Sequence, residues 1–511
     1  MRNRLRRPYF TRFFCLVFMV AGAFFAASAY STPISVEQHL RRAEFTGMSI
    51  SPDGKRLAAL LPHKDRRNLA VIDLEKRTRS VITAFDTYDV IDFSWINNER
   101  LFLRVGYLET TLSRQEYKGT YAVDWDGGNL RNLSEIQGRY VSISPLRRIA
   151  EDAKGEMLVS MNLRRRDGSD VYRLNTKNGR AEILSFDAPA NTGGWTLDAA
   201  NVPRLATTAD RQGNGGLWYR SDEKSPWRQL RTWNESDAAA ETIEPVQFEW
   251  GKSTVLVSSN VGRDTAALMR FDPEQNKLLD VVAEHPWLDI TAADVILAPK
   301  DRSLAGVRVD AEKPSTVWVT PERTDLQKLI DAALPGRYNS YSTDYEGKFA
   351  LVQSWSDTDR GQTFLLNIEK KSLEDLPAFA PWLKIDNFGE RRFLWVTARD
   401  GIKFPAWLSL PPGSNGKNLP LIVHIHGGPV LRAYDYRADA ETLFLASRGY
   451  AVLTPEPRGG TGFGRELTRL GQKQWGRAMQ DDITDAALQL VKEGVADRSK
   501  MCLYEIGRAH V

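Results

Sequence analysis

The sequence has only two cysteines, Cys15 and Cys502, among 511 residues. Cys15 lies within the first 29 residues, so a mature chain without them keeps one cysteine and can form no internal disulfide. Histidine is also scarce, with six residues, and no group of His, Cys and carboxylate residues has the spacing of a metal site. The sequence therefore implies no metal or other cofactor, and large hydrophobic cores must hold the fold together.

Long apolar runs are missing as well, except near the N-terminus. A basic start, "MRNRLRR", precedes an apolar run from Phe13 to Ala27, which closes with the small-x-small sequence Ala27-Ser28-Ala29. This pattern predicts that residues 1–29 are a signal peptide cleaved after Ala29, and that the protein is periplasmic or secreted. The alternative is an uncleaved anchor helix, since the run could nearly span a bilayer, but Gly22 and several alanines favour cleavage.

A strong charge of one sign is absent. The chain has 69 basic and 65 acidic residues, for a net charge of +4. Five of the arginines lie in residues 1–29, so the mature chain has 64 basic against 65 acidic residues. Nothing in this balance favours nucleic acid as a partner. We expect no stable membrane association after signal cleavage, and the sequence does not specify an oligomeric state.

Between about Phe45 and Pro381 long amphipathic helices are absent, and a strand-like unit recurs. Each copy has a few apolar or aromatic residues and then a polar turn residue. The copies end at Asp73, Asp124, Asn175, Ser221, Asp272, Thr320 and Asn367. Spacings of 46 to 51 residues match the length of a propeller blade. Chance recurrence in another all-β domain is the alternative, which six such similar intervals disfavour. The pattern predicts a seven-bladed β-propeller over residues 30–390, with a short N-terminal lead-in.

The pattern changes in residues 391–504, where strands alternate with helices. The run Leu419 to Ile425 is almost continuously apolar, as in a strand buried on both faces. A short helix ending at Gly449 follows, then a second apolar strand, and then a helix that stops at Gly494. This alternation predicts a parallel, doubly wound sheet, so the fold class is β plus α/β.

Two glycine-rich loops follow strands of this predicted sheet. The first, "HIHGGPV", contains His426, Gly427 and Gly428, and the second, "EPRGGTGFG", contains Arg458, Gly459 and Gly460. Paired glycines after a buried strand let backbone N–H groups approach a substrate oxygen, as in an oxyanion-hole loop. A phosphate site is the alternative. However, neither loop has the lysine-serine ending of a P-loop or the spacing of a dinucleotide fingerprint.

Other polar residues in this region have simpler interpretations. His424 is expected to be an ordinary strand side chain. Asp481 and Asp482 lie near the start of a helix, where carboxylates interact favourably with the helix dipole. Cys502 falls in a short apolar strand and is expected to be buried and inert.

The whole pattern resembles a known family. A signal peptide, a propeller and the string "HGGP…PRGGTGFG…WGRAMQDD…VADRSKMCLY" are similar to the prolyl oligopeptidase family of serine peptidases, in particular to exported bacterial members of the acylaminoacyl-peptidase and dipeptidyl-peptidase type. The resemblance implies that residues 391–504 are the N-terminal part of an α/β-hydrolase domain. It also implies a serine-type peptidase acting on peptide or acyl-peptide bonds of oligopeptides.

The same resemblance implies roles for the two loops. The backbone N–H of Gly428 would form half of the oxyanion hole, His426 and Gly427 would shape that loop, and Arg458 would help to set the neighbouring turn with Gly459 and Gly460. Two alternatives remain open from the sequence. One is a non-catalytic periplasmic propeller that serves as a binding protein, and the other is an esterase on the same fold.

The last seven residues depart from the family pattern. The family continues after the strand ending at Tyr504 into a Gly-x-Ser-x-Gly-Gly elbow, but Glu505 stands in place of the first glycine. The serine, aspartate and histidine of the triad are therefore expected beyond Tyr504, and the chain as given is predicted to be an inactive fragment. Residues 505–511, "EIGRAHV", back-translate to the start of a common sequencing adapter, which predicts a non-native tail.

Overall fold

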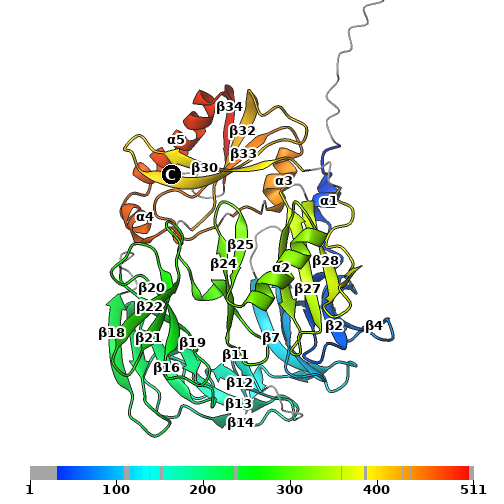
Figure 1. The fold of residues 1–511 in the computed structure, drawn as a ribbon, viewed down its shortest axis with the longest axis vertical. Coiled ribbons are helices and arrows are strands. Elements are labelled where there is room, and N and C mark those ends of the chain that lie inside the picture. The colour runs from blue at the N-terminus through cyan, green and yellow to red at the C-terminus, as the bar shows by residue number, and fades with distance from the viewer. Residues whose placement is uncertain are drawn as a thin grey trace, which may run out of the picture.

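A computed structural model describes residues 32–108, 115–136, 138–149, 154–234, 237, 240–357, 359–384, 388–428, 430–433, 435–437 and 439–505 (Figure 1). The predicted signal peptide, residues 1–29, and residues 506–511 of the predicted tail lie outside these described residues. No helix within the described ranges combines the length and the apolarity that a membrane crossing requires.

Seven antiparallel sheets follow one another along the chain and form the propeller (Figure 1). Blade 1 consists of β1 (Thr46–Ile50), β2 (Arg56–His63), β3 (Arg66–Asp73) and β4 (Thr78–Val81). Blade 2 consists of β5 (Asp89–Trp95), β6 (Arg100–Leu108), β7 (Gln115–Asp124) and β8 (Arg131–Asn132). Blade 3 consists of β11 (Ile143–Arg148), β12 (Glu156–Met161), β13 (Asp170–Asn175) and β14 (Ala181–Ile183). A small hairpin of β9 (Glu135–Ile136) and β10 (Arg139–Tyr140) separates blades 2 and 3.

The other four blades complete the ring. Blade 4 consists of β15 (Thr192–Leu197), β16 (Pro203–Ala209), β17 (Asn214–Tyr219) and β18 (Arg228–Asn234). Blade 5 consists of β19 (Ile243–Phe248), β20 (Val255–Ser259), β21 (Ala267–Asp272) and β22 (Lys277–Ala283). The 3-10 turn η1 (Ala292–Asp294) precedes blade 6, which consists of β23 (Val295–Leu297), β24 (Leu304–Asp310) and β25 (Pro314–Trp318). Blade 7 consists of β26 (Tyr338–Thr343), β27 (Phe349–Ser356), β28 (Asp359–Asn367) and β29 (Ser372–Asp375). The predicted seven-bladed propeller is confirmed.

The sequence repeat marks the third strand of each blade. Asp73, Asp124 and Asn175 are the last residues of β3, β7 and β13, and the other four repeat ends lie within two residues of the ends of β17, β21, β25 and β28. In six blades this third strand is paired on both sides, and its apolar side chains pack between neighbouring blades, as those of β3 do against β5, β6 and β7. The period of the pattern is therefore the length of one blade.

One helix contradicts the expectation that long helices are absent before Pro381. Helix α2 (Pro321–Ala333) stands in blade 6 where the chain order would place a fourth strand. It begins with Pro321 at its first turn and buries Ile330 in the core of blade 7. The expectation was wrong because it overlooked a helical pattern, in which apolar residues recur at the i, i+3, i+4 and i+7 positions: Leu326, Leu329, Ile330 and Ala333.

Side-chain packing closes the ring between the first and last blades. Each blade contains only consecutive strands, so among the described residues no strand is exchanged across the closure. Leu57 of β2 is fully buried in one cluster with Leu351 of β27 and Leu365 of β28. Tyr345 N also donates a hydrogen bond of 3.1 Å to Pro52 O. This closure relies on packing instead of a shared ladder of hydrogen bonds.

The predicted hydrolase domain is built on a five-stranded sheet above one end of the propeller (Figure 1). It is called the hydrolase domain below. Its strand order is β30 (Arg391–Thr397), β31 (Lys403–Ser409), β33 (Ala451–Pro455), β32 (Leu419–His424) and β34 (Ala496–Tyr504). The last three run parallel to one another, and β30 and β31 form an antiparallel hairpin at one edge. The parallel sheet is thus confirmed, with an antiparallel extension.

Helices cover both faces of this sheet. Helix α5 (Ala478–Lys492) packs Ile483, Ala486 and Leu490 onto one face. Side chains along β32 alternate between the two faces of the sheet, and that of His424 points to the face opposite α5. Thr442 of helix α3 (Ala440–Ala446) contacts His424, so α3 lies on this second face. A third helix, α4 (Arg465–Leu470), precedes α5.

The expected burial of Cys502 is wrong, since this residue is exposed. Strand β34 pairs only with β32, so it is the edge strand of the described sheet. Its side chains from Met501 to Tyr504 are exposed, including those of Leu503 and Tyr504. An apolar run indicated burial on two faces, but a strand at an edge can expose the same residues.

The N-terminal lead-in packs against the hydrolase domain. Ile34 N donates to Ser447 Oγ at 3.2 Å, and Arg448 Nη2 donates to Ile34 O at 2.8 Å. Ile34 is buried in a cluster with Phe388 and Leu443. Helix α1 (Val36–Leu40) follows, and its Gln38 O accepts a hydrogen bond from the indole of Trp382. The chain therefore touches the hydrolase domain before it enters blade 1.

The two domains also meet through an apolar cluster. Leu288 from the propeller and Trp407, Tyr436 and Phe463 from the hydrolase domain are buried together. Polar contacts surround this cluster, and one of them joins Asp289 N to Gly462 O at 3.0 Å.

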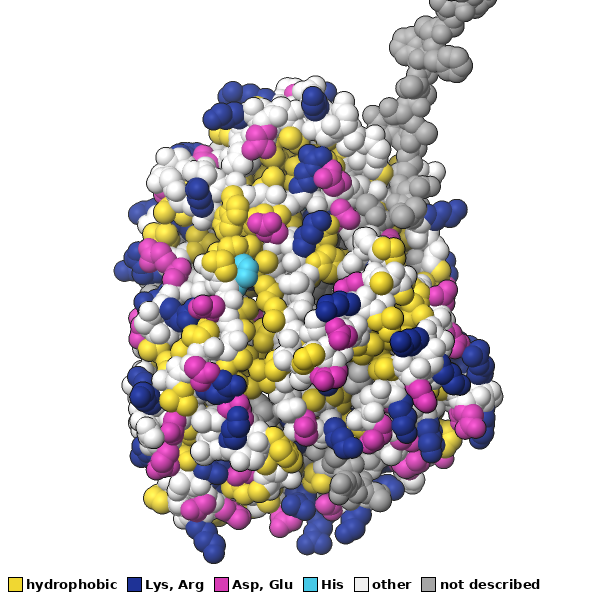
Figure 2. Space-filling view, viewed as in Figure 1, with side chains coloured by type: hydrophobic (Ala, Val, Ile, Leu, Met, Phe, Trp, Pro, Cys, Tyr) yellow, Lys and Arg dark blue, Asp and Glu magenta, His cyan; other side chains and the backbone are white. Residues whose placement is uncertain are grey.

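The outer surface of the molecule carries side chains of both charges. Figure 2 shows Lys and Arg side chains interspersed with Asp and Glu side chains over the visible face.

Candidate active site

The first loop of interest begins where β32 ends at His424. Strands β32, β33 and β34 are parallel, so their carboxyl ends meet at one edge of the sheet, where α/β folds bind ligands. His424 is partnered with Tyr504 across the ladder, and Ile425 N donates to Tyr504 O at 3.2 Å. Any residue that follows Tyr504 in a turn would therefore start beside the loop that carries Gly427 and Gly428.

Gly428 has a backbone conformation that a side chain would disturb. Its φ is +136°, and a Cβ there would lie 2.9 Å from Leu431 Cγ and 3.2 Å from Val430 N. At Gly427 a Cβ would meet nothing within 4 Å. Both glycines are exposed, and within the described ranges neither backbone N–H donates a hydrogen bond. The loop thus presents unused donors at the surface, as an oxyanion hole requires.

His426 is buried beneath this loop and ties it to the next one. Its Nδ1 lies 2.8 Å from Gly427 O, and because a carbonyl oxygen only accepts, Nδ1 donates. Its Nε2 lies 3.1 Å from Oε2 of Glu456, a fully buried carboxyl group on the loop after β33. The other oxygen, Oε1, accepts from Ala433 N at 2.9 Å. Glu456 thus links both ends of the first loop.

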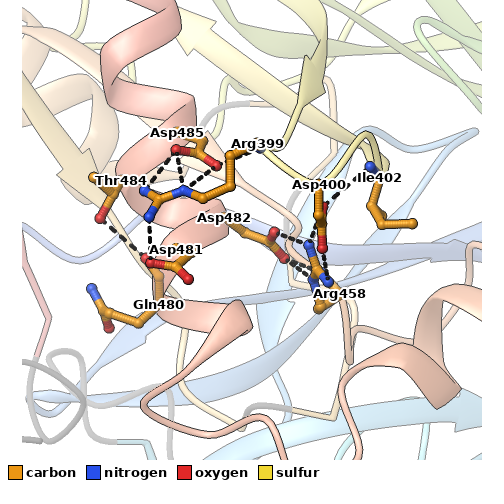
Figure 3. A network of polar contacts seen from close by, with 9 residues as sticks. All are labelled: Arg399, Asp400, Ile402, Arg458, Gln480, Asp481, Asp482, Thr484 and Asp485. Atoms are coloured by element: carbon orange, nitrogen blue, oxygen red, sulfur yellow. Dashed lines mark hydrogen bonds and ion pairs between the residues drawn. The ribbon is translucent and has the colours of Figure 1, made fainter.

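Arg458, on the second loop, is the centre of a buried ionic network (Figure 3). Its Nε and Nη2 donate to the two carboxylate oxygens of Asp482 at 2.8 and 2.7 Å. Its Nη1 and Nη2 donate to Asp400 at 2.7 and 2.9 Å, and its backbone N donates to Asp482 at 3.1 Å. These contacts connect the loop to α5 and to the turn between β30 and β31.

The ion pairs in this network shift the pKa values of the groups that form them. The hydrogen bonds that Arg458 donates to Asp482 and Asp400 raise the pKa of Arg458, and the same bonds to Asp400 lower the pKa of that carboxyl group. Burial pushes the pKa of Asp482 upward, and Arg458 opposes this shift. Three donors from Arg458 point at the Asp482 carboxylate, so we take it to be ionised.

The glycines of the second loop permit a close approach of the chain. Gly459 has φ +94°, and a Cβ there would lie 2.7 Å from Met479 Cε. A Cβ on Gly471, at the end of α4, would lie 2.2 Å from Gly459 Cα. Gly460 O accepts a hydrogen bond of 2.8 Å from Thr468 Oγ1 of α4. Here the glycines let α4 and α5 pack against the loop, and they do not form an exposed cradle.

Asp481 and Asp482 differ, although they were expected to share one role. Asp481 is partly exposed and pairs with Arg399 at 3.0 Å, alongside Asp485, which also binds Arg399 (Figure 3). Asp482 is fully buried and binds Arg458. The helix dipole alone therefore does not account for Asp482. The sequence reasoning missed the partnership of Asp482, Asp400 and Arg458, and it also missed Glu456, because these contacts join separate segments.

His424 is a strand residue, as expected, and it has acidic neighbours on α3. One ligand atom from each of His424, Asp439 and Glu441 lies within 4.8 Å of the others. Asp439 uses its two oxygens to cap α3, accepting from Thr442 N at 2.8 Å and from Thr442 Oγ1 at 2.7 Å. Burial lowers the pKa of His424. The helix cap accounts for Asp439, and we assign no metal to this group.

Comparisons with known proteins agree with this geometry. The sequence model described as the prolyl oligopeptidase family matches residues 436–504. A dipeptidyl aminopeptidase BIII of Pseudoxanthomonas mexicana is 26% identical over 90% of this chain and 66% of its own length. Dipeptidyl peptidase family member 6 of Caenorhabditis elegans is 28% identical over 66% of this chain and 47% of its own length. The chain thus spans about two thirds of the first relative and about half of the second.

Solved structures support the same architecture. A puromycin-hydrolyzing peptidase of Mycobacterium tuberculosis superposes with a TM-score of 0.63 at 13% identity, covering 93% of this chain and 75% of the other. At that identity the match concerns the fold alone. Together the comparisons confirm the predicted resemblance to the prolyl oligopeptidase family and the predicted combination of a propeller with an α/β-hydrolase domain.

Proposed function

We propose that this chain, similar to prolyl oligopeptidase family members, is part of a serine peptidase that hydrolyses peptide bonds of oligopeptides. One observation carries the proposal. The carboxyl end of β34 lies beside the exposed N–H groups of Gly427 and Gly428, at the edge where a nucleophile after Tyr504 would emerge. Relatives described as dipeptidyl peptidases support a preference for short peptides.

The chemistry would be acyl transfer. A serine Oγ expected beyond Tyr504 attacks the peptide carbonyl carbon while a histidine takes its proton. The oxygen that becomes negative accepts a hydrogen bond from Gly428 N–H, and the proton then passes to the leaving amine. Water next attacks the acyl-serine and releases the carboxylic acid. Glu456 and His426 would hold the Gly428 donor in place during both steps.

The test uses the complete product of the gene, purified from its own host or expressed to its natural stop codon. We expect a fluorophosphonate probe to label one serine and dipeptide p-nitroanilides to be cleaved, and we expect both signals to vanish when that serine is replaced by alanine. Residues 1–511 alone should give neither signal. Hydrolysis of p-nitrophenyl acetate without any cleavage of peptides would favour the esterase alternative. Absence of labelling in the complete protein would favour the non-catalytic scaffold.

We also propose that the protein is exported and that its mature chain begins at or near Tyr30. The basic start, the apolar run and the Ala27-Ser28-Ala29 site support this proposal. Intact-mass and N-terminal peptide measurements on protein from a periplasmic extract should find Tyr30 or a neighbouring residue at the terminus. A variant with Ala29→Tyr should accumulate uncleaved precursor. Recovery of the wild-type protein with Met1 or Arg2 at its terminus would contradict the proposal.

A further inference from the structure

Blade 4 contains a cavity of about 750 Å³ that the peptidase chemistry does not use. Its walls come from the end of β18, the turn between β16 and β17, and the segment that enters blade 4 from blade 3. The next loop, between β18 and β19, reaches the hydrolase domain, because Glu241 Oε1 accepts from Arg465 at 3.2 Å. Asn234, the last residue of β18, lines the cavity, so part of the cavity lies at the end of blade 4 that is near the hydrolase domain, and none of its described lining residues belongs to that domain.

Three indole rings line this cavity, those of Trp218, Trp227 and Trp233. Glycines make room for two of them. A Cβ on Gly215 would lie 2.1 Å from Trp233 Nε1, and one on Gly216 would lie 3.1 Å from Trp218 Nε1. The indoles therefore lie directly over the backbone of β17, which leaves flat aromatic surface beside the cavity. Aromatic rings of this kind offer large apolar area with a polar edge.

Polar groups with unused hydrogen-bonding capacity surround the indoles. The side chains of Gln229, Thr232 and Asn191 line the cavity and form no hydrogen bond with any described residue. The same is true of Trp233 Nε1. These groups together include both donors and acceptors. The neighbouring Asp210, by contrast, already accepts from Asn214 and Gln212.

Charge narrows the class of ligand. No lysine or arginine belongs to the described lining of the cavity, so an anionic ligand would find no counter-charge there. A purely apolar ligand would leave the amide and hydroxyl groups without partners, which costs free energy. Two carboxylates also line the cavity, but Asp187 pairs with Arg220 at 3.2 Å and Asp210 accepts hydrogen bonds from Asn214 and Gln212, so both already have partners. The lining therefore suits a neutral molecule with apolar ring faces and several hydroxyl groups.

We propose that this cavity binds a neutral saccharide. Pyranose rings would stack on the indoles of Trp218 and Trp233, and their hydroxyl groups would exchange hydrogen bonds with Gln229, Thr232 and Asn191. A proline-rich peptide also stacks on aromatic rings, but its tertiary amides donate no hydrogen bond, so it would leave the acceptor oxygens of these side chains unused. The site is separate from the proposed peptidase centre and does not depend on it.

Binding can be measured without any enzymatic activity. The complete gene product is titrated with maltohexaose, cellohexaose and N-acetylchitohexaose, and binding is followed by tryptophan fluorescence and by calorimetry. We expect at least one of the three to bind with a Kd of about 1 mM or tighter. The double variant Gln229→Ala/Thr232→Ala removes two exposed side chains and should weaken that binding about tenfold or more. Thr232→Trp, which fills the cavity, should abolish it.

The matched control is Gln275→Ala/Thr78→Ala, which removes the same two residue types at exposed positions in blades 5 and 1. This control should bind the saccharide as the wild type does, and thermal unfolding should show all variants folded. Three results would each overturn the proposal. They are no binding of any of the three sugars, equal binding by wild type and Thr232→Trp, and binding of a proline-rich peptide in place of the sugars.

Discussion

Replacement of Arg458 by alanine is expected to lower the free energy of unfolding by about 3–5 kcal/mol, because it leaves a buried charge without its partner. Asp482 is fully buried and receives three hydrogen bonds from Arg458. No other described residue donates a hydrogen bond to its carboxylate. Urea unfolding of the folded protein at neutral pH, followed by tryptophan fluorescence, would measure the change.

Arg399 provides a matched control on the same pair of elements. It also joins the β30–β31 turn to α5, by ion pairs to Asp481 and Asp485, but its side chain is 54% exposed (Figure 3). Exposed ion pairs contribute little to stability, so Arg399→Ala should lower the free energy of unfolding much less than Arg458→Ala does. Equal losses for Arg399→Ala and Arg458→Ala would show that burial does not decide the difference, and would contradict the prediction.

A double replacement separates charge from packing. In Arg458→Met/Asp482→Leu the buried pair is replaced by apolar side chains, which should recover most of the stability that Arg458→Ala loses.

The stability that the outer partner, Asp400, contributes should depend on pH. Since Arg458 lowers the pKa of Asp400, its contribution is fully present above the ordinary carboxylate pKa and is lost as the pH falls through the lowered value. The Arg458→Ala variant should lack that part of the acid dependence.

The architecture could be predicted from the sequence because it repeats. Seven third strands, from β3 to β28, carry the same short apolar run and the same polar end, so the period reveals the blade. The hydrolase sheet was predictable for a related reason, since the continuous apolar run of β32 and the helical period of α5 are local patterns. Such features depend on neighbours in sequence.

Features that depend on partners far along the chain could not be predicted. Asp482 has an ordinary position in the first half of a helix, and only the fold reveals that Arg458 lies against it. In the sequence Glu456 has no feature that separates it from other loop residues, and only the fold shows that its carboxylate lies 3.1 Å from His426. Cys502 lies in an apolar run, but the strand order leaves it at an edge. The sequence predicted a role for the two loops, and geometry was needed to find which charged residues hold them in place.

The second large effect is expected at Gly428. In the complete protein, Gly428→Ala should lower kcat for a dipeptide p-nitroanilide about 100-fold, because a displacement of about 1 Å in a positioned group can cost this much. The added Cβ would lie 2.9 Å from Leu431 Cγ and 3.2 Å from the backbone nitrogen of Val430, at a φ of +136°. The loop must shift to accept it, and the shift moves the N–H that we propose faces the developing oxyanion.

Gly427→Ala provides the comparison, since its Cβ would meet nothing within 4 Å and its φ is not in the left-handed region. Its loss in kcat should stay within about tenfold, because the donor at Gly428 is not displaced. Fluorophosphonate labelling distinguishes the donor from the nucleophile: Gly428→Ala should still be labelled, only more slowly, while KM changes little. A Gly428→Ala enzyme with unchanged kcat would show that this N–H does not stabilise the transition state, and the oxyanion donor would then have to be sought elsewhere.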